Sequence, residues 1–137
     1  SVRNAWLARE RLELHLEGAF LEPLPGREEH GNCIVVVRNP SAVPVVVEDV
    51  GFRLKSGRRV PAAMNDGPPF PPLALEPGHQ FAAYSNIVEL ATFAEPAYDN
   101  DPATHAWVRR SGRRYTQKKL PDGWLERWAA RHPPARE

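Results

Sequence analysis

The stretch that most constrains the fold is residues 33–54, CIVVVRNPSAVPVVVEDVGFRL, in which two apolar runs flank a turn. The first run, residues 33–37, has no charged side chain, and four of its five residues are β-branched. Such side chains have restricted χ1 rotamers and fit the pleated, half-buried surface of a sheet. Asn39, Pro40 and Ser41 favour a turn after this run. The stretch therefore predicts the central hairpin of a β-sandwich, with the first strand apolar on both faces.

The second apolar run changes parity along its length. Val45 and Val47 are odd-numbered, whereas Phe52 and Leu54 are even-numbered. A strand with a strict period of two cannot bury both pairs on one face. A β-bulge adds one residue to a strand and restores the alternation. We therefore predict a bulge near residues 48–49.

Several further strands are expected on the same grounds. Residues 12–17 alternate leucine with polar side chains, which is typical of a half-buried strand. Turn signals at 55–58 and 76–78 separate short apolar segments. Residues 104–117 predict a strand–turn–strand hairpin around Ser111 and Gly112, with Ala106 and Val108 facing the core and Trp107 facing the other side. Strands therefore dominate the chain.

Two helices complete the predicted architecture. Asn86, followed three residues later by Glu89, is typical of a helix start, and Pro96 ends the segment. This predicts a short helix over 86–94 that crosses between the two sheets. A terminal helix is predicted over 123–131, where Asp122 can cap it and the apolar residues at helical spacing are Trp124, Leu125 and Trp128.

Length and composition favour one folded domain. The chain has 137 residues, a net charge of +1, fifteen prolines and one cysteine. We expect a lead-in segment (1–11), a β-sandwich domain (12–121), and a C-terminal helix with its tail (122–137). One cysteine excludes an internal disulfide, and Cys33 is expected to be a buried small hydrophobic residue. The near-zero net charge gives no general electrostatic argument for nucleic acid or an anionic membrane.

Three segments together carry a family resemblance: VVRNPSAVPVVVEDVGFRLKSGRR (36–59), LALEPGHQF (73–81) and AWVRRSGRRYTQKKLPDGWL (106–125). As a set they resemble a group of small bacterial proteins, frequent in actinobacteria, that have an immunoglobulin-like sandwich. The resemblance covers roughly residues 12–125. It implies an immunoglobulin-like antiparallel β-sandwich of about seven or eight strands. It implies no catalytic residues.

No enzyme motif is present in the sequence. There is no G-x-S-x-G, no H-E-x-x-H and no glycine loop that would hold a phosphate. The five histidines are scattered along the chain. Glu28, Glu29 and His30 are adjacent on a loop and lack a distant ligand, and Met64 is a single soft ligand. We therefore expect neither an enzyme nor a metal or cofactor site, and an enzyme or metal carrier is kept only as the weakest alternative.

A non-catalytic binding or scaffolding module is the expected function, with another protein as the partner. Two surfaces are candidates: the proline-rich loop 61–72 and the basic hairpin 109–119. An alternative is binding of nucleic acid or of an anionic membrane through the basic hairpin. The candidate contact residues are Phe70, Trp107, Arg109, Arg110, Arg113, Arg114, Tyr115, Lys118 and Lys119.

The expected location is the cytoplasm. The sequence has no signal-peptide pattern and no apolar span long enough for a membrane helix. Because the chain begins with Ser1, membrane association through a segment upstream is a second expectation.

Overall fold

The computed structural model describes residues 9–18, 32–62 and 72–131, which form a mostly β fold with two antiparallel sheets and two α-helices. The strands are β1 (Glu13–Gly18), β2 (Asn32–Arg38), β3 (Val45–Leu54), β4 (Arg59–Pro61), β5 (Leu73–Leu75), β6 (Gln80–Asn86), β7 (Ala103–Arg110) and β8 (Arg114–Lys119). The helices are α2 (Ile87–Thr92), the short 3-10 helix η2 (Pro96–Tyr98) and α3 (Trp124–Arg131).

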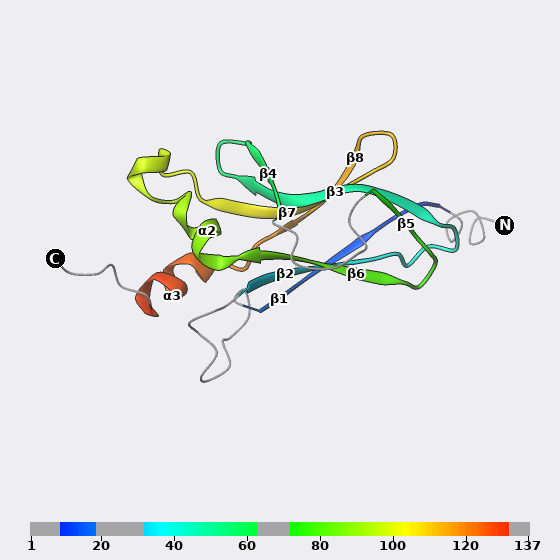
Figure 1. Cartoon of the computed structure of the whole chain (residues 1–137), viewed down its shortest axis with the longest axis horizontal. Coiled ribbons are helices and arrows are strands. Elements are labelled where there is room, and N and C mark those ends of the chain that lie inside the picture. Colours follow the sequence, from blue (N-terminus) through cyan, green and yellow to red (C-terminus); the bar gives the residue numbers. More distant parts are fainter. Residues whose placement is uncertain (1–8, 19–31, 63–71, 132–137) are drawn as a thin grey trace.

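The two sheets lie in separate layers around a shared core (Figure 1). The smaller sheet has the order β1-β2-β6, and the larger sheet has the order β4-β3-β7-β8, with β5 also paired to β3. Apolar side chains from both layers meet in one cluster that includes Leu14, Val35 and Val37 from the smaller sheet and Phe52 and Val108 from the larger. Each strand therefore has one face toward the core and one face outward.

The predicted hairpin of residues 33–54 is wrong. Both of its strands form, but β2 pairs with β1 and β6, whereas β3 pairs with strands of the other sheet. Asn39 holds the crossing between the layers, since its buried side-chain amide donates to the carbonyl oxygens of Val43 and Leu75, each at 2.8 Å. Its backbone N–H also donates to the carbonyl of His79, at 3.0 Å. The turn residues thus connect two sheets rather than two neighbouring strands.

The predicted bulge is confirmed. In the β3–β7 ladder, Val47 pairs with Arg110 and Asp49 pairs with Arg109, so Glu48 is the extra residue. Val47 before this point and Val50 after it are both buried. The bulge therefore turns both apolar sets of β3 into the same core, as the parity change requires.

Both predicted helices form, and α2 is shorter than expected. The Asn86 side chain accepts hydrogen bonds from the backbone N–H groups of Val88 (2.7 Å) and Glu89 (3.4 Å), as a helix cap does. The helix ends at Thr92 because the following N–H groups bond three residues back and tighten the chain before Pro96. It links β6 of one sheet to β7 of the other, and α3 packs Trp124 into the core. Among the described residues, we find no helix with the length and apolar character needed to cross a membrane.

Candidate interaction surface

The outward face of the larger sheet is the candidate interaction surface. In β3 and β7 the buried core residues include Phe52, Leu54, Ala106 and Val108, so the residues between them point away from the core. We call this surface the outer basic face. Its members, on strands β3, β4, β7 and β8, are Asp49, Gly51, Arg53, Arg59, Pro61, His105, Trp107, Arg109, Tyr115, Gln117 and Lys119.

A glycine and a tryptophan form the centre of the outer basic face. Gly51 pairs directly with Trp107 across the two central strands. A Cβ atom on Gly51 would lie 2.2 Å from the carbonyl oxygen of Val60 and 2.9 Å from Cζ2 of Trp107. The missing side chain therefore leaves the space into which the indole packs, as aromatic residues do beside glycine in sheets. Trp107 is only 4% exposed, although it lies on the outward face.

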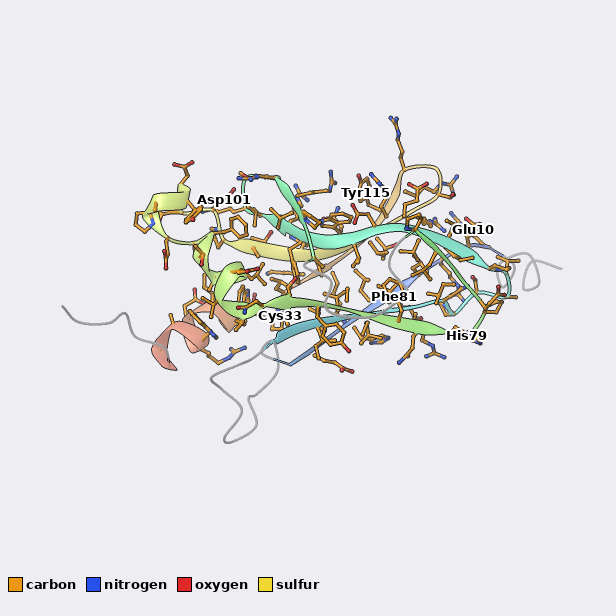
Figure 2. The ribbon with its side chains drawn as sticks, viewed as in Figure 1. Glu10, Cys33, His79, Phe81, Asp101 and Tyr115 are labelled. Atoms are coloured by element: carbon orange, nitrogen blue, oxygen red, sulfur yellow. The ribbon has the colours of Figure 1, made fainter. Side chains whose placement is uncertain are left out.

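Tyr115 and Arg59 extend this packing to both edges of the sheet. The Tyr115 ring packs edge-on against Trp107, with ring centroids 5.7 Å apart and an interplanar angle of 70°. The guanidinium carbon of Arg59 lies 4.1 Å from the centroid of the Tyr115 ring. Because β4 and β8 are opposite ends of the strand order, Arg59 and Tyr115 reach toward each other across the central strands. Tyr115, which is labelled in Figure 2, lies at the larger sheet and is partly exposed to solvent.

One row of this face contains only basic side chains. The register places Arg59 opposite Arg53, Arg53 opposite His105, and His105 opposite Lys119. We call these four residues the basic row. Neighbouring strands are about 4.8 Å apart, so the row is about 15 Å long. Like charges directly opposite each other destabilise a sheet, and Arg59 opposite Arg53 is such a pair.

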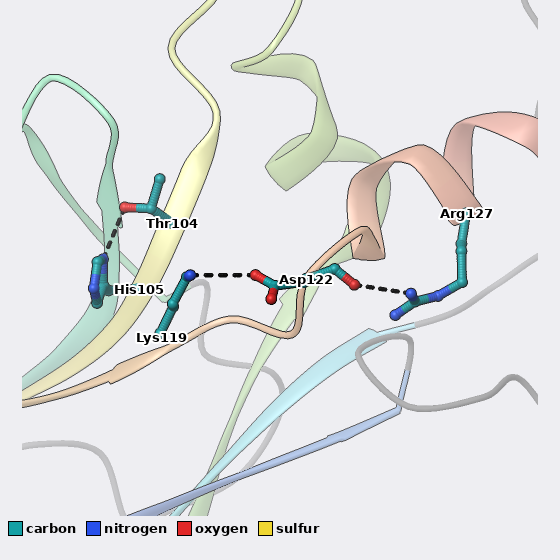
Figure 3. Close-up of polar contacts among 5 residues, drawn as sticks. All are labelled: Thr104, His105, Lys119, Asp122 and Arg127. Carbon is teal, nitrogen blue, oxygen red and sulfur yellow. Dashed lines mark hydrogen bonds and ion pairs between the residues drawn. The ribbon is translucent and has the colours of Figure 1, made fainter.

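Two basic residues of this face, Arg109 and Lys119, form ion pairs with carboxylates. Arg109 Nε lies 3.3 Å from Glu48 Oε2. At the end of the basic row, Lys119 Nζ lies 3.2 Å from Asp122 Oδ1 (Figure 3). The backbone carbonyl of Asp122 accepts a hydrogen bond from the Arg127 guanidinium. Among the described residues, neither Arg53 nor Arg59 forms an ion pair. On this face, the positive charge that no described carboxylate pairs with therefore lies on these two arginines.

The predicted basic hairpin divides between two faces. Trp107, Arg109, Tyr115 and Lys119 lie on the outer basic face. The register places the alternate residues on the opposite face of the sheet, and Arg113 lies in the exposed turn with a φ of 58°. The members on the opposite face are Arg110, Arg114 and Lys118. The hairpin therefore does not present one continuous basic patch.

Arg110 forms a hydrogen bond to the backbone of a distant residue. Its guanidinium donates to the backbone carbonyl of Glu10, near the start of the described chain. Of the proline-rich loop 61–72, only the ends are described: Pro61 belongs to β4, and Pro72 precedes β5. The predicted contact residue Phe70 lies outside the described residues.

Sequence reasoning missed Arg53 and Arg59. The signal was present, because Phe52 and Leu54 face the core and therefore place Arg53 outward. The turn over residues 55–58 then pairs Arg53 with Arg59. The predicted basic hairpin includes only β7 and β8, whereas Arg53 and Arg59 lie on β3 and β4 of the same face.

A cleft of about 530 Å³ lies between β4, β6, α2 and η2. Its lining includes Val60, Leu90, Phe93 and Tyr98. Two polar side chains of its wall already have partners: the Asn86 side chain caps α2, and the Thr92 hydroxyl donates to the Val88 carbonyl at 2.7 Å.

The titratable groups show no arrangement typical of catalysis among the described residues. Cys33 is fully buried, and desolvation raises the pKa of its thiol to about 12. His105 Nδ1 contacts the Thr104 hydroxyl at 2.9 Å (Figure 3). Within the described residues, the only histidine–carboxylate pair joins His15 and Glu13, at 3.7 Å. In this part of the chain, no three metal-ligating side chains come together. The residues that the sequence analysis considered for a metal at 28–30 and Met64 lie outside it.

Comparison of the chain with family models, curated proteins and solved structures finds no match.

Proposed function

We propose that the protein is a non-catalytic protein-interaction module that contacts its partner through the outer basic face. The observation that supports this most is the pair Arg53 and Arg59, which are placed side by side by β3 and β4 without an ion-pair partner among the described residues. Such an arrangement costs stability, and costs of this kind are typical of functional sites.

The packing beneath the arginines also supports a binding surface. Trp107 fills the space beside Gly51, and Tyr115 and Arg59 pack around it. Rigid surfaces with aromatic and arginine side chains are common at the centres of protein interfaces. The outer basic face thus supplies positioned side chains rather than a mobile charged loop.

We propose further that the two-sheet fold is an immunoglobulin-like sandwich. The strand orders β1-β2-β6 and β4-β3-β7-β8 support this, because sandwiches of this type divide their strands between two antiparallel sheets with connections that cross between the layers. This proposal concerns the fold alone, since such sandwiches present many unrelated binding sites.

Binding of nucleic acid or of an anionic membrane is the alternative function. Base stacking requires an exposed ring face, whereas Trp107 is buried and Tyr115 has Arg59 over its ring. Membrane binding through this face would be favoured by an apolar patch. The exposed large apolar residues of the described chain are instead spread over β3, α2, η2 and β8: Val46, Val88, Tyr98 and Tyr115. These observations favour a protein partner.

A capture experiment tests the proposed surface. Tagged wild-type protein, Arg53→Glu and Arg38→Glu are incubated with an extract of the native cell, and retained proteins are compared. Arg38 is exposed on the smaller sheet and serves as the control. Both variants replace an arginine by a glutamate, so they change the net charge equally. We expect specific proteins to be retained by wild type and Arg38→Glu and to be lost with Arg53→Glu. Identical sets on all three proteins would contradict the proposal.

A further inference from the structure

We propose that the basic row, Arg59, Arg53, His105 and Lys119, binds the carboxylates of an acidic segment of the partner protein. This inference rests on the proposed function and identifies the chemistry that the outer basic face recognises. The row crosses strands β4, β3, β7 and β8 of the larger sheet, and its members are directly opposite one another in register.

The two arginines are held in place for such contacts. Arg59 is fixed over the Tyr115 ring at 4.1 Å, and Arg53 Nη1 donates to Gln117 Oε1 at 3.3 Å. A guanidinium has five N–H donors, so each arginine has donors left after these contacts. A planar guanidinium binds a carboxylate through two parallel hydrogen bonds. Because both groups already have partners that orient them, less conformational entropy is lost on binding.

The charge around the row selects an anion. In the described part of the chain, the only acidic residue that forms an ion pair with a member of the row is Asp122, at the Lys119 end, where both side chains are largely exposed. Exposed pairs of this kind are weak, so an incoming carboxylate can compete for Lys119. At the opposite end, Arg53 and Arg59 have no ion-paired carboxylate among the described residues.

The dimensions of the row suit a short extended segment. An extended chain advances about 3.3 Å per residue, so about five residues span the roughly 15 Å row. Alternate side chains of such a segment point to the same side. Two or three acidic residues at alternate positions would therefore face the basic row.

A fluorescent peptide of about ten glutamates is the probe for this site. Its affinity for the whole protein is measured by anisotropy at about 0.05 M salt and again at about 0.3 M salt, because screening weakens exposed charge contacts. We expect Arg53→Glu to weaken binding about tenfold or more, and Arg38→Glu to weaken it less than about twofold. Circular dichroism and thermal unfolding of both variants test whether each is folded.

The controls separate the possible failures. Equal losses of peptide affinity with Arg53→Glu and Arg38→Glu would overturn the basic row, since only net charge would then matter. No peptide binding by wild type, together with partner capture that depends on Arg53, would overturn the acidic segment and leave the proposed surface intact. Tighter binding of a single-stranded oligonucleotide or of anionic vesicles than of the peptide would likewise overturn the assignment to a protein segment. Failure of the capture experiment as well would contradict the proposed function itself.

Discussion

The outward faces of the two sheets differ in charge. On the larger sheet, the basic row places Arg59, Arg53 and Lys119 across adjacent strands. On the smaller sheet, the edge strand β1 turns Glu13 and Glu17 outward, because its leucines face the core. The larger sheet therefore has a row of basic side chains on its outward face, whereas the edge strand of the smaller sheet has two acidic ones.

The two faces also differ in how charge is arranged along the register. On the smaller sheet, Glu13 lies directly opposite Arg38, an attractive pair. On the larger sheet, Arg53 lies directly opposite Arg59, a repulsive pair. Opposite charges across strands stabilise a sheet and like charges destabilise it. The smaller face thus includes an attractive cross-strand pair, whereas the basic row of the larger face includes a repulsive one.

The largest expected effect comes from Gly51→Ala, which tests whether the outer basic face depends on its packed centre. The added Cβ would lie 2.2 Å from a backbone oxygen, so β4 and Trp107 must both move. We expect a loss of about 3 kcal/mol in the free energy of unfolding, measured by urea denaturation. Gly112→Ala, where no atom lies within 4 Å, is the control and should cost about 1 kcal/mol for its positive φ. Equal losses would refute the packing argument.

Asn39→Ala tests the connection between the two layers. It removes the donor to the carbonyls of Val43 and Leu75 and leaves both oxygens without that partner in a buried site. We expect a loss of about 2 kcal/mol in the free energy of unfolding. Asn86→Ala, which removes an exposed helix cap, should cost only about 1 kcal/mol. If the two variants unfold at the same urea concentration, Asn39 does not hold the crossing.

Charge reversals on the two faces should change stability in opposite directions. Arg53→Glu places a carboxylate between Arg59 and His105, and we expect a gain of about 0.5 kcal/mol. Glu13→Lys places a second cation opposite Arg38, and we expect a loss of about 0.5 kcal/mol. Thermal unfolding of both variants at low salt measures the difference. A loss of stability with Arg53→Glu would show that the basic row is not under electrostatic strain.

The smallest effect at neutral pH concerns Cys33, which faces the core from the smaller sheet. Burial raises the pKa of its thiol to about 12, so the folded protein keeps the proton that the unfolded chain releases above about pH 9. The unfolded state then binds fewer protons, and stability must fall as the pH rises from about 9 to about 12. Cys33→Val should lose stability less steeply than wild type in this range. Parallel pH curves for the two proteins would refute a buried, protonated thiol.

Local patterns in the sequence predicted individual elements well. The parity change between Val47 and Phe52 required a bulge, and the bulge forms at Glu48. Asn86 capped the predicted helix, although the helix ends before residue 94. Each of these depends on neighbouring residues, so a local pattern is sufficient.

The choice of strand partner could not be predicted in the same way. Two apolar runs joined by a short turn are compatible with a hairpin or with a crossing between layers, and the contacts of Asn39 with the distant Leu75 accompany the crossing. The membership of the outer basic face could be predicted only in part for a related reason. Clustering in sequence grouped Arg109 with Arg110, although alternation places them on opposite faces. Arg53 lies beside the residues of the last hairpin because of the long-range pairing of β3 with β7.

The most direct test of the outer basic face is to map the acidic peptide onto the protein by its amide chemical shifts in solution. We predict that the largest shifts fall on β3, β4, β7 and β8, around Arg53 and Arg59, and that they vanish with Arg53→Glu. Shifts concentrated on β1, β2 and β6, or spread equally over both sheets, would contradict the account.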